Sequence, residues 1–219
     1  ELLYTTFYDI LNDLMSYKNI DVYVTGSNSK MLSKDIVTNF RDRGSEIMVF
    51  PLSFAEYYSV SDLDKIDALE EYMMYGGMPL SVIEKDESEK KKYLLSLHNN
   101  VFLKDIVERY NLKDDVLLSS LIDILYSSVG SLTNTHKLAN TAESMMKVKS
   151  SDNTIKKYID YLEDAFIFRS SKRYDVKGKR YFGTNLKYYA TDVGLRNAKL
   201  NFRQYERSHI MENIIYNEL

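Results

Sequence analysis

The stretch from Asp152 to Tyr189, DNTIKKYIDYLEDAFIFRSSKRYDVKGKRYFGTNLKYY, decides the fold of the second half of the chain. Apolar side chains recur at helical spacing in its first part, which predicts a helix over 152–166. The residues of this apolar face are Ile155, Tyr158, Ile159, Leu162 and Phe166. Two runs rich in β-branched and aromatic residues follow, Ile167–Tyr174 and Arg180–Tyr189, around a Lys177-Gly178 turn. They predict a β-hairpin.

Helical patterns dominate the residues that precede this stretch. Helices are expected over 53–59, 62–75, 87–110, 114–129 and 134–142, with breaks at Gly76-Gly77-Met78-Pro79 and near Asn111. Three helices followed by a hairpin is the order of elements in a winged helix-turn-helix. A last helical pattern begins at residue 209.

The first fifty residues alternate between helix and strand patterns. An amphipathic helix is predicted over 1–18, and a second helix from Met31 to Phe40. Short apolar runs at 20–24 (IDVYV) and 47–50 (IMVF) predict buried strands. This alternation favours an α/β unit with a parallel sheet. The fold class expected for the whole chain is therefore mixed and mostly α.

The composition excludes several classes of protein. Hydrophobic residues make up 44% and charged residues 28%, which is typical of a globular chain. The absence of cysteine excludes disulfides, thiolate metal sites and cysteine nucleophiles. The three histidines lie far apart in sequence, so no metal site is expected. No apolar run approaches the roughly 20 residues that span a bilayer, and no signal peptide is visible, which predicts a cytoplasmic protein without a membrane partner.

Charge is distributed unevenly along the chain. Residues 1–130 carry 13 Lys and Arg against 22 Asp and Glu, a net charge of −9. Residues 131–200 carry 14 against 7, a net charge of +7, and residues 201–219 carry 2 against 3. The basic surplus indicates an anionic partner for the middle segment alone.

Specific motifs run in order along almost the whole chain. They are Thr25-Gly26-Ser27-Asn28-Ser29, Leu32-Ser33, Arg41-Asp42-Arg43-Gly44, Pro51-Leu52-Ser53-Phe54, Gly76-Gly77-Met78-Pro79, Lys104-Asp105-Ile106, Asn153-Thr154-Ile155, Lys187-Tyr188-Tyr189, Asp192-Val193-Gly194-Leu195-Arg196 and Glu212-Asn213. This set resembles a bacterial and archaeal family of AAA-type P-loop ATPases. In that family, a helical region, a winged helix and a restriction-endonuclease-like domain follow the ATPase core.

The resemblance implies four parts. Residues 1–58 correspond to a remnant of the ATPase core, 59–112 to a helical lid or linker, and 113–200 to the winged-helix domain. Residues 201–219 correspond to the first helix of a truncated endonuclease-like domain. The chain begins at Glu1 without a methionine and ends at Leu219 within a helical pattern, so it is expected to be a piece of a longer protein.

The phosphate-binding motifs of the family are absent. No GxxxxGK[ST] sequence occurs, and no apolar strand ends in Asp-Glu. The resemblance implies ATP and Mg²⁺ as cofactors of the intact parent. No cofactor is expected for this chain alone, which is predicted not to hydrolyse ATP because the main electrostatic contributions to catalysis are missing.

The resemblance also assigns roles to residues of the core remnant. Asn28 occupies the sensor-1 position, where a polar side chain orients the attacking water; the alternative is a simple helix N-cap. Arg43, with Arg41 beside it, matches the place of an arginine finger that acts across a subunit boundary. The alternative for these arginines is a solvated basic turn.

Gly77 and Pro79 have two interpretations. Related ATPases use a Gly-x-Pro segment to contact adenine, which would make these residues nucleotide-binding. The alternative is a helix break, because two glycines and a proline stop a helix without any ligand. Asp192 and the Lys104-Asp105-Ile106 segment are interpreted as structural. Glu212 and Glu218 are helix residues that do not by themselves establish a nuclease.

The basic segment offers the best candidate for an activity of this chain. Helix 152–166 would be the recognition helix of a DNA-binding module, and the hairpin would supply further phosphate contacts. The candidate nucleic-acid-binding residues are Asn153, Lys156, Lys157, Arg169, Lys172, Arg173, Lys177, Lys179 and Arg180. The alternative is a lid or oligomerisation module that contacts only protein. Residues 1–52 are also expected either to pair with another copy of the chain or to pack abnormally, because an incomplete parallel sheet leaves an edge unpaired.

Overall fold

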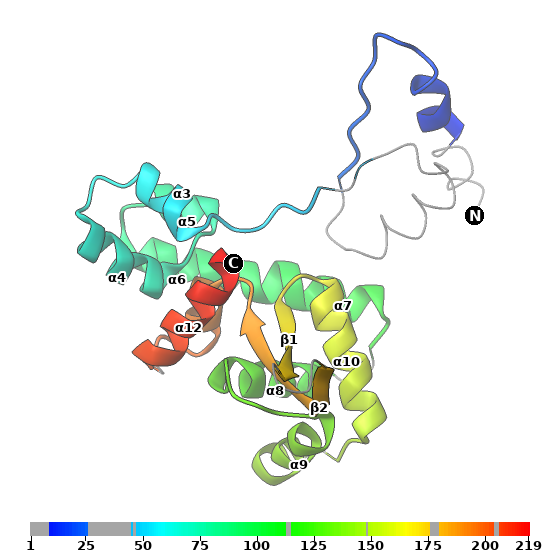
Figure 1. Cartoon of the computed structure of the whole chain (residues 1–219), viewed down its shortest axis with the longest axis vertical. Coiled ribbons are helices and arrows are strands. Elements are labelled where there is room, and N and C mark those ends of the chain that lie inside the picture. The colour runs from blue at the N-terminus through cyan, green and yellow to red at the C-terminus, as the bar shows by residue number, and fades with distance from the viewer. Residues whose placement is uncertain are drawn as a thin grey trace. The chain divides into compact units, whose positions relative to one another are not determined.

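The computed structural model describes residues 9–25, 45, 47–112, 115–147, 149–175, 180–203 and 206–219. The chain divides into two compact units, residues 1–49 and residues 50–219 (Figure 1). The predicted helix from Met31 to Phe40 lies outside the described residues.

The first unit does not contain the predicted strands. Residues 9–14 are helical, as expected for part of the helix over 1–18, but residues 20–24 and 47–50 have irregular backbone, so the strand predictions there are wrong. Tyr23 and Val49 are 88% and 91% exposed. A strand forms where its backbone groups pair with a neighbour, and the sheet of the described residues consists of the later hairpin alone. The apolar composition predicted a buried strand but could not supply its partner.

The second unit is mostly helical, which confirms the predicted fold class. Its helices in chain order are α3 (Phe54–Ser59), α4 (Lys65–Tyr75), α5 (Pro79–Ile83), α6 (Glu87–Ser96), the π-helix η1 (Leu97–Leu103), α7 (Lys104–Arg109), α8 (Asp115–Ser127), α9 (Thr135–Met146), α10 (Asp152–Asp164), α11 (Val193–Lys199) and α12 (Arg207–Glu218). Side-chain oxygens accept backbone N–H groups at most of the helix starts. The capping residues are Ser53, Asp64, Asp86, Asn134, Ser151 and Asp192.

Strands β1 (Phe168–Asp175) and β2 (Arg180–Ala190) form the predicted antiparallel hairpin. Their register runs from the Phe168–Ala190 pair to the Asp175–Arg180 pair, with an irregularity between Lys172 and Tyr174. An isolated bridge adds Thr133, whose N–H and C=O pair with Leu186 at 2.9 and 2.8 Å. The segment between α8 and α9 therefore extends the hairpin by one residue pair.

Two helices were not predicted from the sequence, α5 and α11. The break at Gly76 to Pro79 is confirmed, because α4 ends at Gly76 with a φ of +69° and Pro79 begins α5. Helix α5 has only 5 residues, too few to display a period. Helix α11 has 7 residues, of which 6 are buried, so it shows no alternation between an apolar and a polar face.

Three apolar clusters hold the second unit together. The hairpin core contains buried residues from Ile106 to Ala190, contributed by α7–α10 and both strands. The α4 core joins Tyr72 and Met73 to Ile210 and Ile214, and the α6 core joins Tyr75 and Leu94 to α11. Figure 1 shows helices α3–α6 at one end of this unit, the hairpin with α8–α10 at the other, and α12 between them.

Replacing Gly194 by Ala should destabilise the protein. Alanine normally favours a helix by about 1 kcal/mol over glycine, but a Cβ at Gly194 would lie 2.0 Å from the carbonyl oxygen of Tyr75. We expect Gly194→Ala to lower the free energy of unfolding by about 1–3 kcal/mol in urea titrations followed by circular dichroism. Ser208→Ala, at an exposed position of α12, should stay within about 0.5 kcal/mol of the parent. A Gly194→Ala variant as stable as the parent would contradict this close packing.

Candidate functional site

Asp192 links the end of the hairpin to the turn between α4 and α5. Its side chain is buried, and its carboxylate accepts N–H groups from Gly77 at 2.7 Å and Leu195 at 2.8 Å. Burial raises the pKa of Asp192 to about 6, although hydrogen bonds from Leu195, Gly77 and Gly194 oppose that rise. The interpretation of Asp192 as structural therefore gains a specific role: this carboxylate caps α11 and holds the Gly76-Gly77 turn.

Gly77 uses its backbone polar groups within the protein. Its N–H is donated to Asp192, and its carbonyl accepts the N–H of Leu52 at 2.8 Å. A Cβ at this position would lie 2.0 Å from the carbonyl oxygen of Leu52, so only glycine fits. Pro79 is exposed at the first position of α5. The geometry thus gives both residues a structural explanation, and their contact with a nucleotide stays a prediction.

Two buried polar residues of α11 satisfy carbonyls at the ends of two other helices. Arg196 donates its Nε–H to the carbonyl of Tyr126 in α8 at 2.9 Å. Asn197 donates its amide to the carbonyls of Met73 and Met74 in α4, both at 2.9 Å. The last carbonyls of a helix lack partners within it, and a cation near them is electrostatically favourable. Helix α11 therefore completes the C-terminal ends of α4 and α8 together.

His98 is a second buried titratable group close to this region. It lies in the π-helix η1, which packs against α11, and its ring centroid is 5.8 Å from that of Tyr126. Its Nδ1 lies 3.2 Å from the side-chain oxygen of Asn99, whereas its Nε2 has no hydrogen-bond partner among the described residues. Burial lowers the pKa of His98 to about 4, so the ring is neutral at pH 7.

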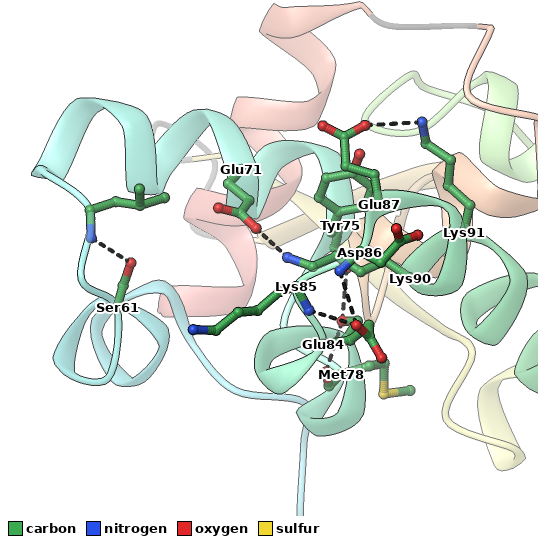
Figure 2. A network of polar contacts seen from close by, with 12 residues as sticks. Ser61, Glu71, Tyr75, Met78, Glu84, Lys85, Asp86, Glu87, Lys90 and Lys91 are labelled. Carbon is green, nitrogen blue, oxygen red and sulfur yellow. Dashed lines mark hydrogen bonds and ion pairs between the residues drawn. The ribbon is translucent and has the colours of Figure 1, made fainter.

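A polar network joins α4 to α6 (Figure 2). Buried Lys90 forms an ion pair with Glu71, and its Nζ lies 5.1 Å from the ring centroid of Tyr75. Lys91 pairs with Glu87 at 3.4 Å. Burial and the Glu87 carboxylate raise the pKa of Tyr75 to about 12. These groups neutralise one another, so the network explains the packing of two helices and provides no activated nucleophile.

The two acidic residues of α12 are also engaged in tertiary contacts. Glu212 accepts hydrogen bonds from Lys187 at 2.7 Å and from the Tyr189 hydroxyl at 2.8 Å, and the Lys187 contact holds the pKa of Glu212 below its usual value. Glu218 accepts the backbone N–H of Phe54 at 2.5 Å. Both carboxylates therefore tie α12 to other elements.

Helix α10 presents the predicted face to solvent. Asn153, Lys156, Lys157 and Asp160 are exposed, while Ile155, Tyr158, Ile159 and Leu162 on the other side are buried. Phe166, the last residue of the predicted apolar face, lies just beyond α10 and is only partly buried. The amphipathic pattern of the sequence thus placed these side chains correctly.

The hairpin residues differ from one another in their surroundings. Lys172 is exposed on β1. The Arg169 guanidinium lies 5.2 Å from the ring centroids of both Phe50 and Tyr216, and the Tyr216 ring stacks on Tyr189 at 3.9 Å. Arg169 is also exposed, so these cation–π contacts give it a structural role while its contact with nucleic acid stays a prediction. The sequence showed a basic residue here but not the two rings beside it.

Several predicted site residues lie outside the part of the chain that the structure describes. They are Asn28, Arg41 and Arg43, together with Lys177 and Lys179 and the side chains of Arg173 and Arg180. Conversely, the sequence analysis did not single out His98 or Asn197 as interacting residues. The sequence did carry one signal for the contacts of α11: Arg196 and Asn197 lie within the otherwise apolar run 193–198. Polar side chains in a buried segment require hydrogen-bond partners.

Among the described residues, no group of three or more histidine, aspartate or glutamate side chains could hold a metal ion. None of the helices described is both long and apolar enough to cross a membrane.

Most of the chain matches known protein families. Residues 66–206, well over half of its length, match the family described as "Domain of unknown function (DUF8612)". The chain belongs to this family. Residues 3–58 match the family described as "AAA domain", which supports the expected relationship to AAA-type proteins. The AAA match ends within α3, and the DUF8612 match begins in α4.

Two relatives are similar to the chain over almost all of its length. An "Uncharacterized protein" of Haemophilus influenzae is 39% identical over 215 residues, which cover 96% of this chain and 53% of the relative. The "Uncharacterized protein MJ1544" of Methanocaldococcus jannaschii is 28% identical over 221 residues, which cover 95% of this chain and 48% of the relative. The chain spans about half the length of these relatives.

The two buried titratable groups should have opposite effects on stability between about pH 4 and 6.5. The pKa of Asp192 is higher in the folded protein than its ordinary value of 3.8, so its stabilising contribution is present below pH 3.8 and is lost as the pH rises through 6. The pKa of His98 falls from 6.5 to about 4, so its contribution is present above pH 6.5 and is lost as the pH falls through 4. Each shift corresponds to something on the order of 3 kcal/mol.

Single variants should reveal the two opposing slopes. Between pH 6.5 and 4, His98→Phe should become more stable relative to the parent, and Asp192→Asn should become less stable relative to the parent. Urea unfolding at a series of pH values measures these slopes. A loss of stability that is the same at every pH shifts the curve of a variant but does not change its slope. Slopes equal to that of the parent would show that the two groups do not titrate as their burial implies.

Proposed function

We propose that this chain is the part of an AAA-type ATPase that binds duplex DNA, with α8–α10 and the β1–β2 hairpin acting as a winged helix. The order of elements supports this proposal, because three helices precede a hairpin and Thr133 adds a bridge to it. In such a module the third helix enters the major groove and the hairpin lies along the backbone. Here α10 is the third helix.

The observation that carries the proposal is the exposed outer face of α10. Asn153, Lys156 and Lys157 project from the side opposite the buried stripe, within the segment 131–200 that carries a net charge of +7. Lysines neutralise phosphates, and an asparagine side chain can pair with a base edge. Asp160 is exposed on the same helix. Its negative charge favours a shallow docking in which phosphate contacts supply most of the affinity.

In this proposal, ATP binding is a property of the intact ATPase and not of this chain alone. The 219 residues contain no Walker A sequence, and Gly77 already uses its backbone groups within the fold, so this chain does not fit a bound triphosphate. In the intact ATPase, ATP and Mg²⁺ would bind through a Walker A motif outside these 219 residues, with Asn28 as sensor 1 and Arg43 or Arg41 as an arginine finger. The proposed DNA contact requires none of these residues.

A contact module for protein partners is the second candidate function. Apolar side chains are exposed around the corner between α3 and α4: Tyr58, Val60, Leu63 and Ile66, of which Ile66 is 73% exposed. Apolar residues that cluster on a surface often mark a protein interface. Self-association through residues 1–52 would be a further expression of this function. The DNA experiment separates the two candidates.

Removal of the α10 lysines should weaken DNA binding. We expect the chain to bind a fluorescent duplex with an affinity that falls steeply between about 50 and 200 mM salt. The double variant Lys156→Ala/Lys157→Ala should reduce the slope of log K against log salt by about two. Lys65→Ala/Lys92→Ala removes the same charge from exposed positions on α4 and α6 and should leave the slope unchanged. Absence of binding by the parent at low salt would exclude this function and favour the protein-contact module.

Arg169 and Lys172 should behave differently although both lie on β1. Arg169→Ala removes the exposed guanidinium near Phe50 and Tyr216, so it should lower the free energy of unfolding by about 0.5–1 kcal/mol with little change in the salt slope. Lys172→Ala should leave stability unchanged and reduce the salt slope by about one. The reverse pattern in urea and DNA titrations would assign the phosphate contact to Arg169.

A further inference from the structure

Helix α11 lies where two groups of helices meet. The hairpin core ends at Ala190, and Val193 and Leu195 then enter the α4 and α6 cores. Asp192 stands between these residues in sequence and is buried. Helix α11 and the residue that caps it therefore join helices α3–α6 to the hairpin core, beside a second connection through α12.

Polar contacts attach α11 to both groups. On the side of α3–α6, Asp192 accepts the Gly77 N–H, and Asn197 donates to the carbonyls of Met73 and Met74. On the side of α8, Arg196 donates to the Tyr126 carbonyl, and Lys199 lies 3.1 Å from an Asp123 carboxylate oxygen. Hydrogen bonds have defined lengths and directions, so these contacts fix the relative position of the ends of α4 and α8.

We propose that α11 is a latch: helices α3–α6 open from the hairpin core as one cooperative unit when the contacts of Asp192 with Gly77 and of Asn197 with α4 break, together with the packing of α4 on α12. The contacts of Arg196 and Lys199 keep α11 attached to α8 in the open state. Proteins open in such units with free energies below that of global unfolding. The proposal does not depend on DNA binding.

The buried carboxylate makes the latch weaker than an apolar contact of the same size. A charge removed from water gains only part of its hydration free energy back from three N–H groups, and opening restores that hydration. The opening unit contains α3, which lies at the end of the AAA-domain match. A force or ligand that acts on this segment would therefore reach the hairpin core through Asp192 and through the contact of Phe54 with Glu218.

The variant Asp192→Asn tests the latch without removing the helix cap. Asparagine caps a helix about as well as aspartate, so its oxygen can still accept the Leu195 N–H. Its NH₂ group would then face the Gly77 N–H, and two donors cannot bond. Asp86→Asn is the matched control, because Asp86 is also an N-cap aspartate, but its side-chain hydrogen bonds stay within three residues and at the protein surface.

The measurement is native-state hydrogen exchange of the whole chain, resolved by residue. In Asp192→Asn, amides of α4 should exchange about 10- to 100-fold faster, since a hydrogen bond to a charged group is lost. Amides of β1 and β2 should change little, and Asp86→Asn should change neither group. Equal acceleration in α4 and in the hairpin would show a single cooperative unit and overturn the proposal, as would no acceleration in α4.

The parent chain provides a second test should Asp192→Asn fail to fold. With low concentrations of denaturant, the α4 amides should exchange through an opening with a smaller denaturant dependence than that of the α8 amides, because less surface is exposed. Opening of α4 and α8 with one common free energy and one common denaturant dependence would overturn the proposal.

Discussion

The contact of the buried Asp192 carboxylate with the Gly77 backbone is the constraint on which the second unit depends. It requires three backbone segments, near residues 52, 76 and 193, to approach one another more closely than any side chain allows, as the Cβ distances at Gly77 and Gly194 show. The end of α4, the start of α5 and the exit from the hairpin are all fixed at this point. Since the carboxylate is buried, its N–H donors are indispensable, and one of them, Gly77, lies 115 residues from Asp192 in the chain.

The accuracy of the sequence predictions follows the length and exposure of each element. Helix α10 has 13 residues with one buried face and one exposed face, so its pattern determined both its position and the side chains that it presents. Helix α11 is short and buried almost all round, and its hydrophobic pattern carried no period to detect. The segment 47–50 is apolar and β-branched, yet it is not a strand, because pairing depends on a partner that no local pattern encodes.

The role of a candidate site residue could be predicted from the sequence only where its interaction partners lie close to it in the chain. A basic residue in a hairpin suggests a phosphate contact, but Arg169 lies near two rings from Phe50 and α12, which are 119 residues before it and 47 residues after it in the chain. The motif at Gly77 was visible in the sequence, whereas the use of its N–H by Asp192 was not. In both cases a distant partner gives the residue a structural role that no local pattern shows, and its binding role stays a prediction. The resemblance to AAA-type ATPases named residues such as Asn28, and it could not say how the following helices are joined.

Polar junctions and apolar cores have different consequences for a protein that changes shape. An apolar interface tolerates small shifts, because its energy depends mainly on buried area, whereas a buried hydrogen bond is either made or lost. Two adjacent side chains of α11 bond to the ends of α4 and α8, so the relative position of these helices has discrete rather than continuous alternatives. The same buried polar groups that cost stability thus give the α11 junction its sensitivity to a displacement of the turn at Gly77.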